Sequence, residues 1–176
     1  MEGIPGSRKD DFNFSVSGPV WDSDRWADVI AHQPSYAQIN FNITHRMYRP
    51  PGVRSRVARP ADPAKVRIPP YYPDHEVTRR DWAEYLDVIQ EMDGQVGRLL
   101  DRLEADGLAA TTIVIFIGDH GRTMLRGKQW PYDSGLHIPM IVRWPEALPV
   151  PSQAVPGTVD AARVEPGSRT CTDRQS

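Results

Sequence analysis

The 176-residue chain has a single cysteine, Cys171. One thiol cannot form an internal disulfide, and it excludes a zinc site built from several cysteines. The chain lacks an apolar run near the ~20 residues that a membrane-spanning helix needs. It also lacks an excess of positive charge, because 21 Lys and Arg stand against 23 Asp and Glu, a net charge of -2. We therefore expect neither a nucleic-acid partner nor membrane association.

The remaining composition is that of a folded protein rich in ordered loops. Hydrophobic residues make up 39% of the chain and charged residues 25%, which is typical of a globular domain. The 17 prolines are close to twice the average frequency of about 5%. We expect an irregular segment over 1–22, one α/β domain over 23–150 and a disordered tail over 151–176, which contains no aromatic residue and no Leu or Ile.

One long helix is predicted over residues 79–106. Apolar side chains recur there at helical spacing, and charged side chains, Asp87 among them, mostly fill the other face. Thr78 with Asp81 predicts a capping box at its start. Gly107 predicts its end, because glycine tolerates the left-handed conformation that commonly terminates helices.

Three strands and a short helix complete the predicted elements. Ser23 is the expected N-cap of the short helix, and the alternation over 36–41 predicts a half-buried strand. The runs 112–117 and 139–144 are apolar and rich in β-branched residues, as is typical of parallel strands covered on both faces. A strand, a long helix and a second strand in succession predict a parallel, doubly wound sheet.

A proline-rich arm precedes the long helix. A loop of this length is usually functional or a wrapping arm. Its positive charge is either a solvated face or a surface that binds anions. Over 46–67 the charged residues are Arg46, Arg49, Arg54, Arg56, Arg59, Lys65 and Arg67, against Asp62 alone.

Two predicted strand ends carry residues suited to chemistry, since ligands bind beyond the carboxyl ends of strands in open α/β sheets. Asp119 and His120, between two glycines, offer an oxygen and a nitrogen donor for a divalent metal. The alternative is that Asp119 caps the next segment while His120 forms a hydrogen bond within the loop. His45 follows the first strand, either as a functional group or as an ordinary loop residue.

The loop over 121–138 is rich in glycine and in cationic or titratable side chains. Arg122, Arg126, Lys128 and His137 lie on it. Such a loop suits an anionic, oxygen-rich substrate such as sulfate or phosphate. Exposed charges without a function are the alternative.

Several ordered segments together resemble the sulfatases, which belong to the alkaline phosphatase superfamily. The segments are Ile117-Gly118-Asp119-His120-Gly121, Arg126-Gly127-Lys128, Tyr132-Asp133-Ser134-Gly135-Leu136-His137-Ile138-Pro139 and Val142-Arg143-Trp144-Pro145, with Thr-His-Arg at 44–46. The segment Tyr71-Tyr72-Pro73-Asp74-His75 is similar to the subgroup related to heparan N-sulfatases. The resemblance covers about residues 20–158. It implies an α/β fold with part of an alkaline-phosphatase-like sheet, mostly parallel and flanked by helices, and it makes 23–150 the C-terminal part of a catalytic domain.

The resemblance also implies roles for five residues. Asp119 and His120 would ligate a divalent cation, which is calcium in most of the family. Lys128 and His45 would hydrogen-bond the sulfate or the leaving oxygen, and His137 stands where many relatives carry arginine. The implied reaction is hydrolysis of a sulfate ester or sulfamate on a small molecule or glycan, in a periplasmic, extracellular or lysosomal compartment.

The family's nucleophile motif is not found in the sequence. Sulfatases take a formylglycine from Cys-x-Pro/Ala-x-Arg and metal ligands from an Asp pair on the first strand. Cys171 does not match that motif. We therefore expect an N-terminally truncated domain that is inactive alone, with the last ~16 residues out of frame because they lose apolar patterning.

Two other functions stay open at this stage. The chain could be a non-catalytic remnant or a module that binds anionic glycans through the 46–67 arm. It could also belong to the phosphodiester or phosphonate hydrolases of the same superfamily. The sequence makes no prediction of the oligomeric state.

Overall fold

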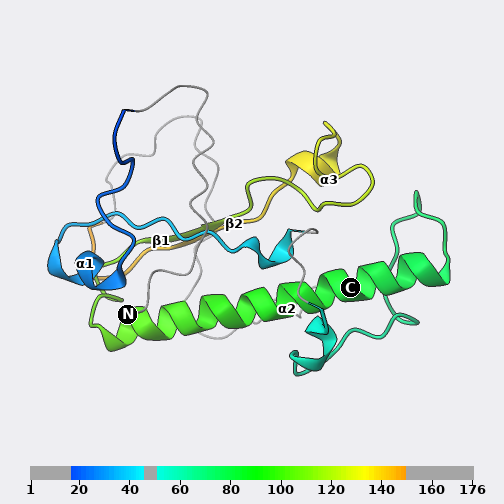
Figure 1. The fold of residues 1–176 in the computed structure, drawn as a ribbon, viewed down its shortest axis with the longest axis horizontal. Coiled ribbons are helices and arrows are strands. Elements are labelled where there is room, and N and C mark those ends of the chain that lie inside the picture. Colours follow the sequence, from blue (N-terminus) through cyan, green and yellow to red (C-terminus); the bar gives the residue numbers. More distant parts are fainter. Residues whose placement is uncertain (1–16, 46–50, 150–176) are drawn as a thin grey trace. The chain divides into compact units, whose positions relative to one another are not determined.

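The computed structural model describes residues 17–45 and 51–149, and Figure 1 shows their elements. The chain divides into two compact units, residues 1–102 and 103–176. The predicted tail over 151–176 lies outside the described residues. None of the described helices is both long and apolar enough to cross a bilayer. In chain order the elements are α1 (Trp26–Ala31), 3-10 turns at Asn42–Thr44 and Val53–Ser55, α2 (Glu76–Ala105), β1 (Val114–Ile117), α3 (Asp133–Leu136) and β2 (Met140–Arg143).

The short helix α1 forms where a helix was predicted, but its predicted cap is wrong. Arg25 is the N-cap residue, and no side chain caps the helix. The Ser23 hydroxyl instead accepts a hydrogen bond from the Arg25 amide at 3.0 Å and donates one to the Asp28 carboxylate at 2.5 Å. Ser23 thus orders the turn before the helix. Trp26 is buried, with the Arg102 guanidinium 5.2 Å from its ring centroid.

The long helix α2 begins three residues before the predicted start. Thr78 therefore lies inside the first turn, and the capping box predicted for Thr78 and Asp81 is wrong. His75 precedes the helix, and its Nδ1 accepts a hydrogen bond from the Val77 amide at 3.2 Å. An imidazole nitrogen thus satisfies one of the amides that a helix start leaves without a partner.

The end of α2 confirms the prediction made from Gly107. Gly107 has φ of 71°, the left-handed conformation that glycine adopts without a steric cost. Its amide donates to the Glu104 carbonyl at 2.9 Å, and the Leu108 amide donates to the Leu103 carbonyl at 3.0 Å. These two bonds form a Schellman motif, which satisfies carbonyls of the last turn.

Residues 51–75, which we call the strap, fold onto α2 within the first unit. Val53 and Val66 of the strap are buried, as are Ala83 and Val88 of the helix. The ring of Tyr72 packs edge to face against the ring of Trp82, with centroids 5.6 Å apart. The predicted arm is therefore packed against the helix through apolar contacts from residue 51 onward.

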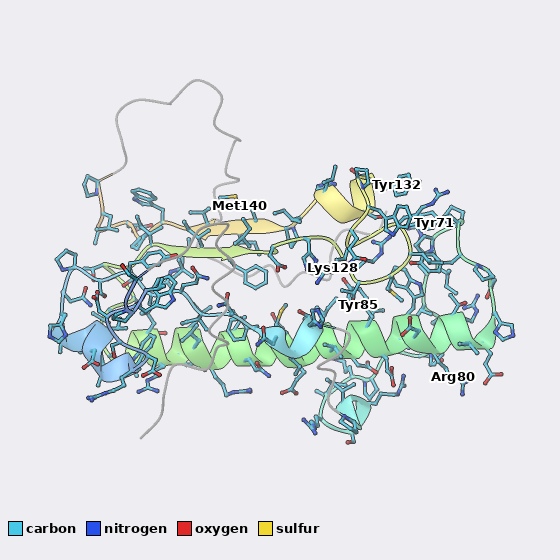
Figure 2. All side chains as sticks on the ribbon, turned by 45° about the horizontal axis from the view of Figure 1, so that its top comes forward. Tyr71, Arg80, Tyr85, Lys128, Tyr132 and Met140 are labelled. Atoms are coloured by element: carbon cyan, nitrogen blue, oxygen red, sulfur yellow. The ribbon has the colours of Figure 1, made fainter. Side chains whose placement is uncertain are left out.

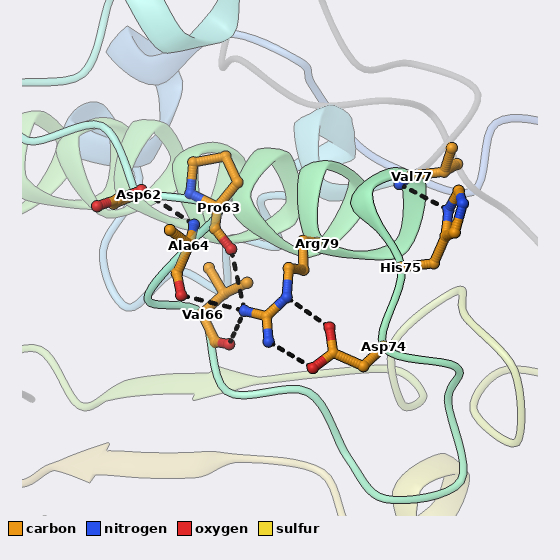
Figure 3. A network of polar contacts seen from close by, with 8 residues as sticks. All are labelled: Asp62, Pro63, Ala64, Val66, Asp74, His75, Val77 and Arg79. Carbon is orange, nitrogen blue, oxygen red and sulfur yellow. Dashed lines mark hydrogen bonds and ion pairs between the residues drawn. The ribbon is translucent and has the colours of Figure 1, made fainter.

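Arg79 of α2 fastens the strap through its backbone. One guanidinium nitrogen donates to three strap carbonyls, and the other two nitrogens bind the carboxylate of Asp74 at 2.5 and 2.7 Å (Figure 3). This pairing lowers the pKa of Asp74 below its usual range, because the carboxylate accepts hydrogen bonds from a cation. The three carbonyls are those of Pro63, Ala64 and Val66, at 3.3, 3.1 and 3.4 Å.

Asp87 is the second anchor, and its predicted place on a solvated face is wrong. The residue is fully buried. One carboxylate oxygen accepts a hydrogen bond from the Ala61 amide at 2.6 Å, and the other lies 3.3 Å from the Arg54 guanidinium. One turn further along, the Gln90 side chain donates to the Arg59 carbonyl at 2.9 Å. The backbone of the strap forms few hydrogen bonds within the strap itself. Side chains of α2 supply the partners that its amide and carbonyl groups need.

The second unit contains an antiparallel pair of strands, so the predicted parallel arrangement is wrong. The register of β1 and β2 runs from Val114 opposite Arg143 to Ile117 opposite Met140. These are the only strands among the described residues, and 36–41 runs as irregular chain outside any ladder. The reason is the connection: parallel strands need a crossover, whereas the segment between β1 and β2 turns back on itself.

Candidate active site

The segment between the strands, residues 118–139, forms a closed loop that carries four of the five predicted site residues. The Gly118 amide donates to the Pro139 carbonyl at 3.1 Å, and the Gly121 amide donates to the Gly135 carbonyl at 2.9 Å. These bonds continue the β1–β2 ladder beyond the strands. The two limbs of the loop therefore stay side by side at its base.

Three glycines allow the backbone of this loop to pack against itself. A Cβ added to Gly121 would lie 1.9 Å from the Ser134 carbonyl oxygen. At Gly127 it would lie 1.8 Å from the Arg122 carbonyl oxygen, and at Gly135 it would lie 2.3 Å from another backbone oxygen. No side chain fits at such distances. The glycine content of the loop is thus a packing requirement.

Asp119 and His120 lie together just beyond the end of β1. An Asp119 carboxylate oxygen is 3.6 Å from His120 Nε2, and Nδ1 of the same ring is 2.8 Å from the Gly121 carbonyl oxygen. When Nδ1 carries the hydrogen and donates to that carbonyl, Nε2 keeps a lone pair on the side of the carboxylate. This is the backbone support that metal-binding histidines commonly have. His120 therefore forms the predicted loop hydrogen bond and still keeps a donor atom for a metal.

Lys128 and His137 lie on the same loop. The Lys128 amide donates to the Arg122 carbonyl at 2.8 Å, and the side chain is drawn in Figure 2. His137 directly follows α3, with its Nδ1 3.6 Å from the Asp133 carboxylate, and both side chains are exposed. The loop thus presents a cation and a second imidazole in addition to the Asp119–His120 pair.

An exposed aromatic pair on this loop was missed by the sequence analysis. The rings of Trp130 and Tyr132 stack with centroids 6.2 Å apart and planes 26° apart, although both residues are exposed. The Arg126 guanidinium lies 5.1 Å from the Tyr132 centroid. The signal that could have revealed this surface is the spacing over 126–132, where two cationic and then two aromatic residues occupy every second position.

His45 belongs to the first unit, whereas the other four predicted site residues belong to the second. It follows the 3-10 turn Asn42–Thr44, and its amide donates to the Asn42 carbonyl at 2.9 Å. Within residues 17–45 and 51–149, no group of three or more His, Cys, Asp or Glu side chains is arranged to hold a metal ion. The Asp119–His120 pair is therefore at most a partial ligand set in this part of the chain.

The chain is similar to one known protein family and to several of its members. The family model "Sulfatase" matches residues 20–165. The chain is 34% identical to an ulvan-active sulfatase of Formosa agariphila over 177 aligned positions, which cover 80% of the chain and 30% of that protein. It is 33% identical to the human N-sulphoglucosamine sulphohydrolase over 85 positions, 48% of the chain and 17% of that enzyme. It is 35% identical to the mouse steryl-sulfatase over 81 positions, 36% of the chain and 13% of that enzyme. No solved structure matches.

Proposed function

Because the chain belongs to the sulfatase family, we propose that it supplies the cation-binding and sulfate-binding part of an active site that hydrolyses sulfate esters or sulfamates. The observation that carries this proposal is the glycine-packed loop, which holds Asp119, His120 and Lys128 beyond the end of β1. The chain spans 30% of the length of the ulvan-active sulfatase. The activity proposed is therefore that of a whole catalytic domain.

The donor atoms of Asp119 and His120 fit a divalent cation. Their nearest oxygen and nitrogen are 3.6 Å apart, and the Gly121 carbonyl fixes the imidazole from its other side. A bound cation would supply Lewis-acid polarisation of a sulfate oxygen. A mixed oxygen and nitrogen pair suits manganese or another transition metal better than calcium, which prefers six to eight oxygens. The family resemblance implies calcium, so the identity of the metal needs a direct comparison.

Lys128 is the proposed partner of the sulfate oxygens. Its ammonium group offers three donors and a compact positive charge, which stabilises negative charge that develops on sulfate as the ester bond breaks. We assign His137 and His45 to the same group of hydrogen-bond donors. In the hydrolysis, water supplies a hydroxyl to sulfur and a proton to the leaving alcohol or amine.

The substrate that we propose is a sulfated ring compound, either a sugar or an aryl sulfate. The stacked rings of Trp130 and Tyr132 are exposed on the loop that carries Lys128. Flat aromatic faces carry partial negative charge and attract the C–H groups of a sugar ring or the edge of an aryl ring. The Arg126 guanidinium beside Tyr132 adds a donor for a sulfate oxygen.

Metal binding by the loop is testable by NMR. We expect Mn²⁺ added to the ¹⁵N-labelled chain to broaden the amides of residues 118–121 first, with a dissociation constant in the millimolar range because the ligand set is partial. Asp119→Ala should abolish this local broadening. Asp101→Ala, which removes an exposed carboxylate from α2, should leave it unchanged. Local broadening that survives in Asp119→Ala would show that the proposed ligand is wrong, and a repeat with Ca²⁺ and La³⁺ compares the metals.

The isolated chain should not hydrolyse 4-nitrocatechol sulfate above background. The sequence lacks the motif that yields the nucleophile, and its absence removes the covalent route. The measurement is release of 4-nitrocatechol at saturating Mn²⁺ or Ca²⁺. Turnover that disappears in Asp119→Ala would contradict this prediction, because a complete site would then lie within these residues.

A further inference from the structure

The path of the strap is fixed largely by side chains of α2 that bind the strap's backbone. Arg79, Asp87 and Gln90 hold it through backbone groups of the strap: an amide at residue 61 and carbonyls at 59, 63, 64 and 66. Among the strap's cations, only Arg54 takes part in this anchoring, through its contact with Asp87. The positions of the other cations along the chain are thus fixed while their side chains stay available.

Three strap arginines are left without an acidic partner in the described part of the chain. Lys65 pairs with Asp62 at 3.7 Å. Within the described residues the Arg56 guanidinium donates to a single acceptor, the Pro51 carbonyl, at 3.4 Å. Arg59 and Arg67 are exposed and form no side-chain hydrogen bond or ion pair within the described residues. Since neither the apolar core nor the anchors use these guanidinium groups, the fold gives no reason for their presence.

We propose that the strap binds a sulfated polysaccharide through Arg56, Arg59 and Arg67. Guanidinium groups match the oxygen geometry of sulfate and donate two parallel hydrogen bonds. A single exposed ion pair contributes little to binding, so free sulfate binds weakly. A polymer that carries one sulfate after another engages several arginines at once, and the contacts then reinforce one another.

The choice of a sulfated polymer over a phosphate polymer such as nucleic acid rests on the proposed function. The net charge of -2 acts on both polyanions alike, so binding to either depends on local contacts with the arginines. The strap and the loop 118–139 are separate segments, so the strap would retain a polymeric substrate and need not touch the bond that is cleaved.

The strap backbone is held in place before any ligand binds, which favours binding of the polymer. Ordering a flexible basic segment on a ligand costs free energy, and a segment that is already ordered avoids that cost. The strap is ordered by the buried Asp87 contact and by the five hydrogen bonds of the Arg79 guanidinium (Figure 3). Loosening these anchors should therefore weaken polymer binding even though Asp87 carries no positive charge.

The test uses dextran sulfate and the full chain in a surface binding assay at several salt concentrations. We expect Arg59→Gln and Arg67→Gln each to weaken binding about threefold to tenfold and to lower the slope of log K against log salt by about one. Arg98→Gln removes an exposed arginine of α2 outside the strap, and its affinity should stay within about twofold of the wild-type chain. Uncharged dextran should not bind.

Controls separate binding from folding and from the proposed function. All three variants should unfold at the wild-type urea concentration, because substitutions of exposed surface residues change stability little. Binding that falls in Lys128→Gln but not in Arg59→Gln or Arg67→Gln would place the polymer on the loop 118–139 and overturn the proposal, whereas the metal titration tests the loop separately. Equal losses in Arg98→Gln and the strap variants would overturn the proposal. Single-stranded DNA that binds as tightly as dextran sulfate would overturn the assignment to sulfate.

Discussion

Replacement of Asp87 by alanine is the most direct perturbation of the strap. The Asp87 carboxylate is fully buried, accepts a 2.6 Å hydrogen bond from the Ala61 amide and lies 3.3 Å from the Arg54 guanidinium. Asp87→Ala leaves that amide without its acceptor and that guanidinium without its acidic partner. We expect the free energy of unfolding to fall, and the strap to separate from α2 more readily.

The size of the effect can be estimated from the two contacts. A hydrogen bond to a charged acceptor contributes about 1.5–3 kcal/mol. The Arg54 side chain is 41% exposed, so its ion pair is screened by water and adds about 0–1 kcal/mol. Asp87→Ala should therefore cost about 2–4 kcal/mol. Asp87→Asn keeps a carbonyl acceptor for Ala61 and should cost about half as much.

Urea unfolding followed by circular dichroism measures the change. With a slope of about 2 kcal/mol per molar urea, the midpoint of Asp87→Ala should fall by about 1–2 M. Asp101→Ala, which removes an exposed carboxylate from the same helix, should change stability by at most about 0.5 kcal/mol. Hydrogen exchange at the Ala61 amide should accelerate in Asp87→Ala alone. Equal midpoints for the two variants, with the Ala61 amide still protected, would refute a buried anchor.

Three further changes test other parts of the fold. Gly121→Ala would place a Cβ 1.9 Å from the Ser134 carbonyl oxygen, so it should destabilise the loop by about 3 kcal/mol and abolish the Mn²⁺ broadening described above. Gly97→Ala adds a Cβ with no atom within 4 Å in the interior of α2, and calorimetry should show a gain of about 0.5–1 kcal/mol. The Arg79 guanidinium lowers the pKa of Asp74, so this carboxylate stabilises the fold above the pKa of an unfolded aspartate and loses that contribution as pH falls through its folded pKa. Below about pH 4, urea titrations should show a steeper loss of stability in the wild-type chain than in Asp74→Asn; parallel curves would contradict the pairing.

The features that sequence predicted well are those with local causes. Helical spacing identified α2, and Gly107 marked its end, because a helix and its Schellman motif involve residues within a few positions of one another. The start of α2 was misplaced since Thr78 and Asp81 match a common capping pattern, whereas His75 performs that role through an uncommon acceptor. A local pattern thus found the helix but not the residue that begins it.

The errors concern contacts between distant residues. An apolar β-branched run is compatible with either strand direction, and only the hydrogen bonds within 118–139 make β1 and β2 antiparallel. Asp87 looks like one of several acidic residues on a solvated helix face. Its burial depends on the Ala61 amide and on Arg54, 26 or more residues earlier in the chain, and helical periodicity carries no information about a partner at that separation.

The candidate site could be predicted to the extent that its residues are neighbours in sequence. Asp119, His120 and Lys128 lie on one loop whose limbs pack at glycines, so consecutive residues were sufficient to place them on it. His45 lies in the other unit. The predicted strand over 36–41 does not form, so the assignment of His45 now rests on the family resemblance. The assignment of His45 can be tested separately from that of the loop. If His45 contacts sulfate, sodium sulfate should shift the ring resonances of His45 as well as those of His137. A shift confined to His137 would leave the loop as the sulfate site and remove His45 from it.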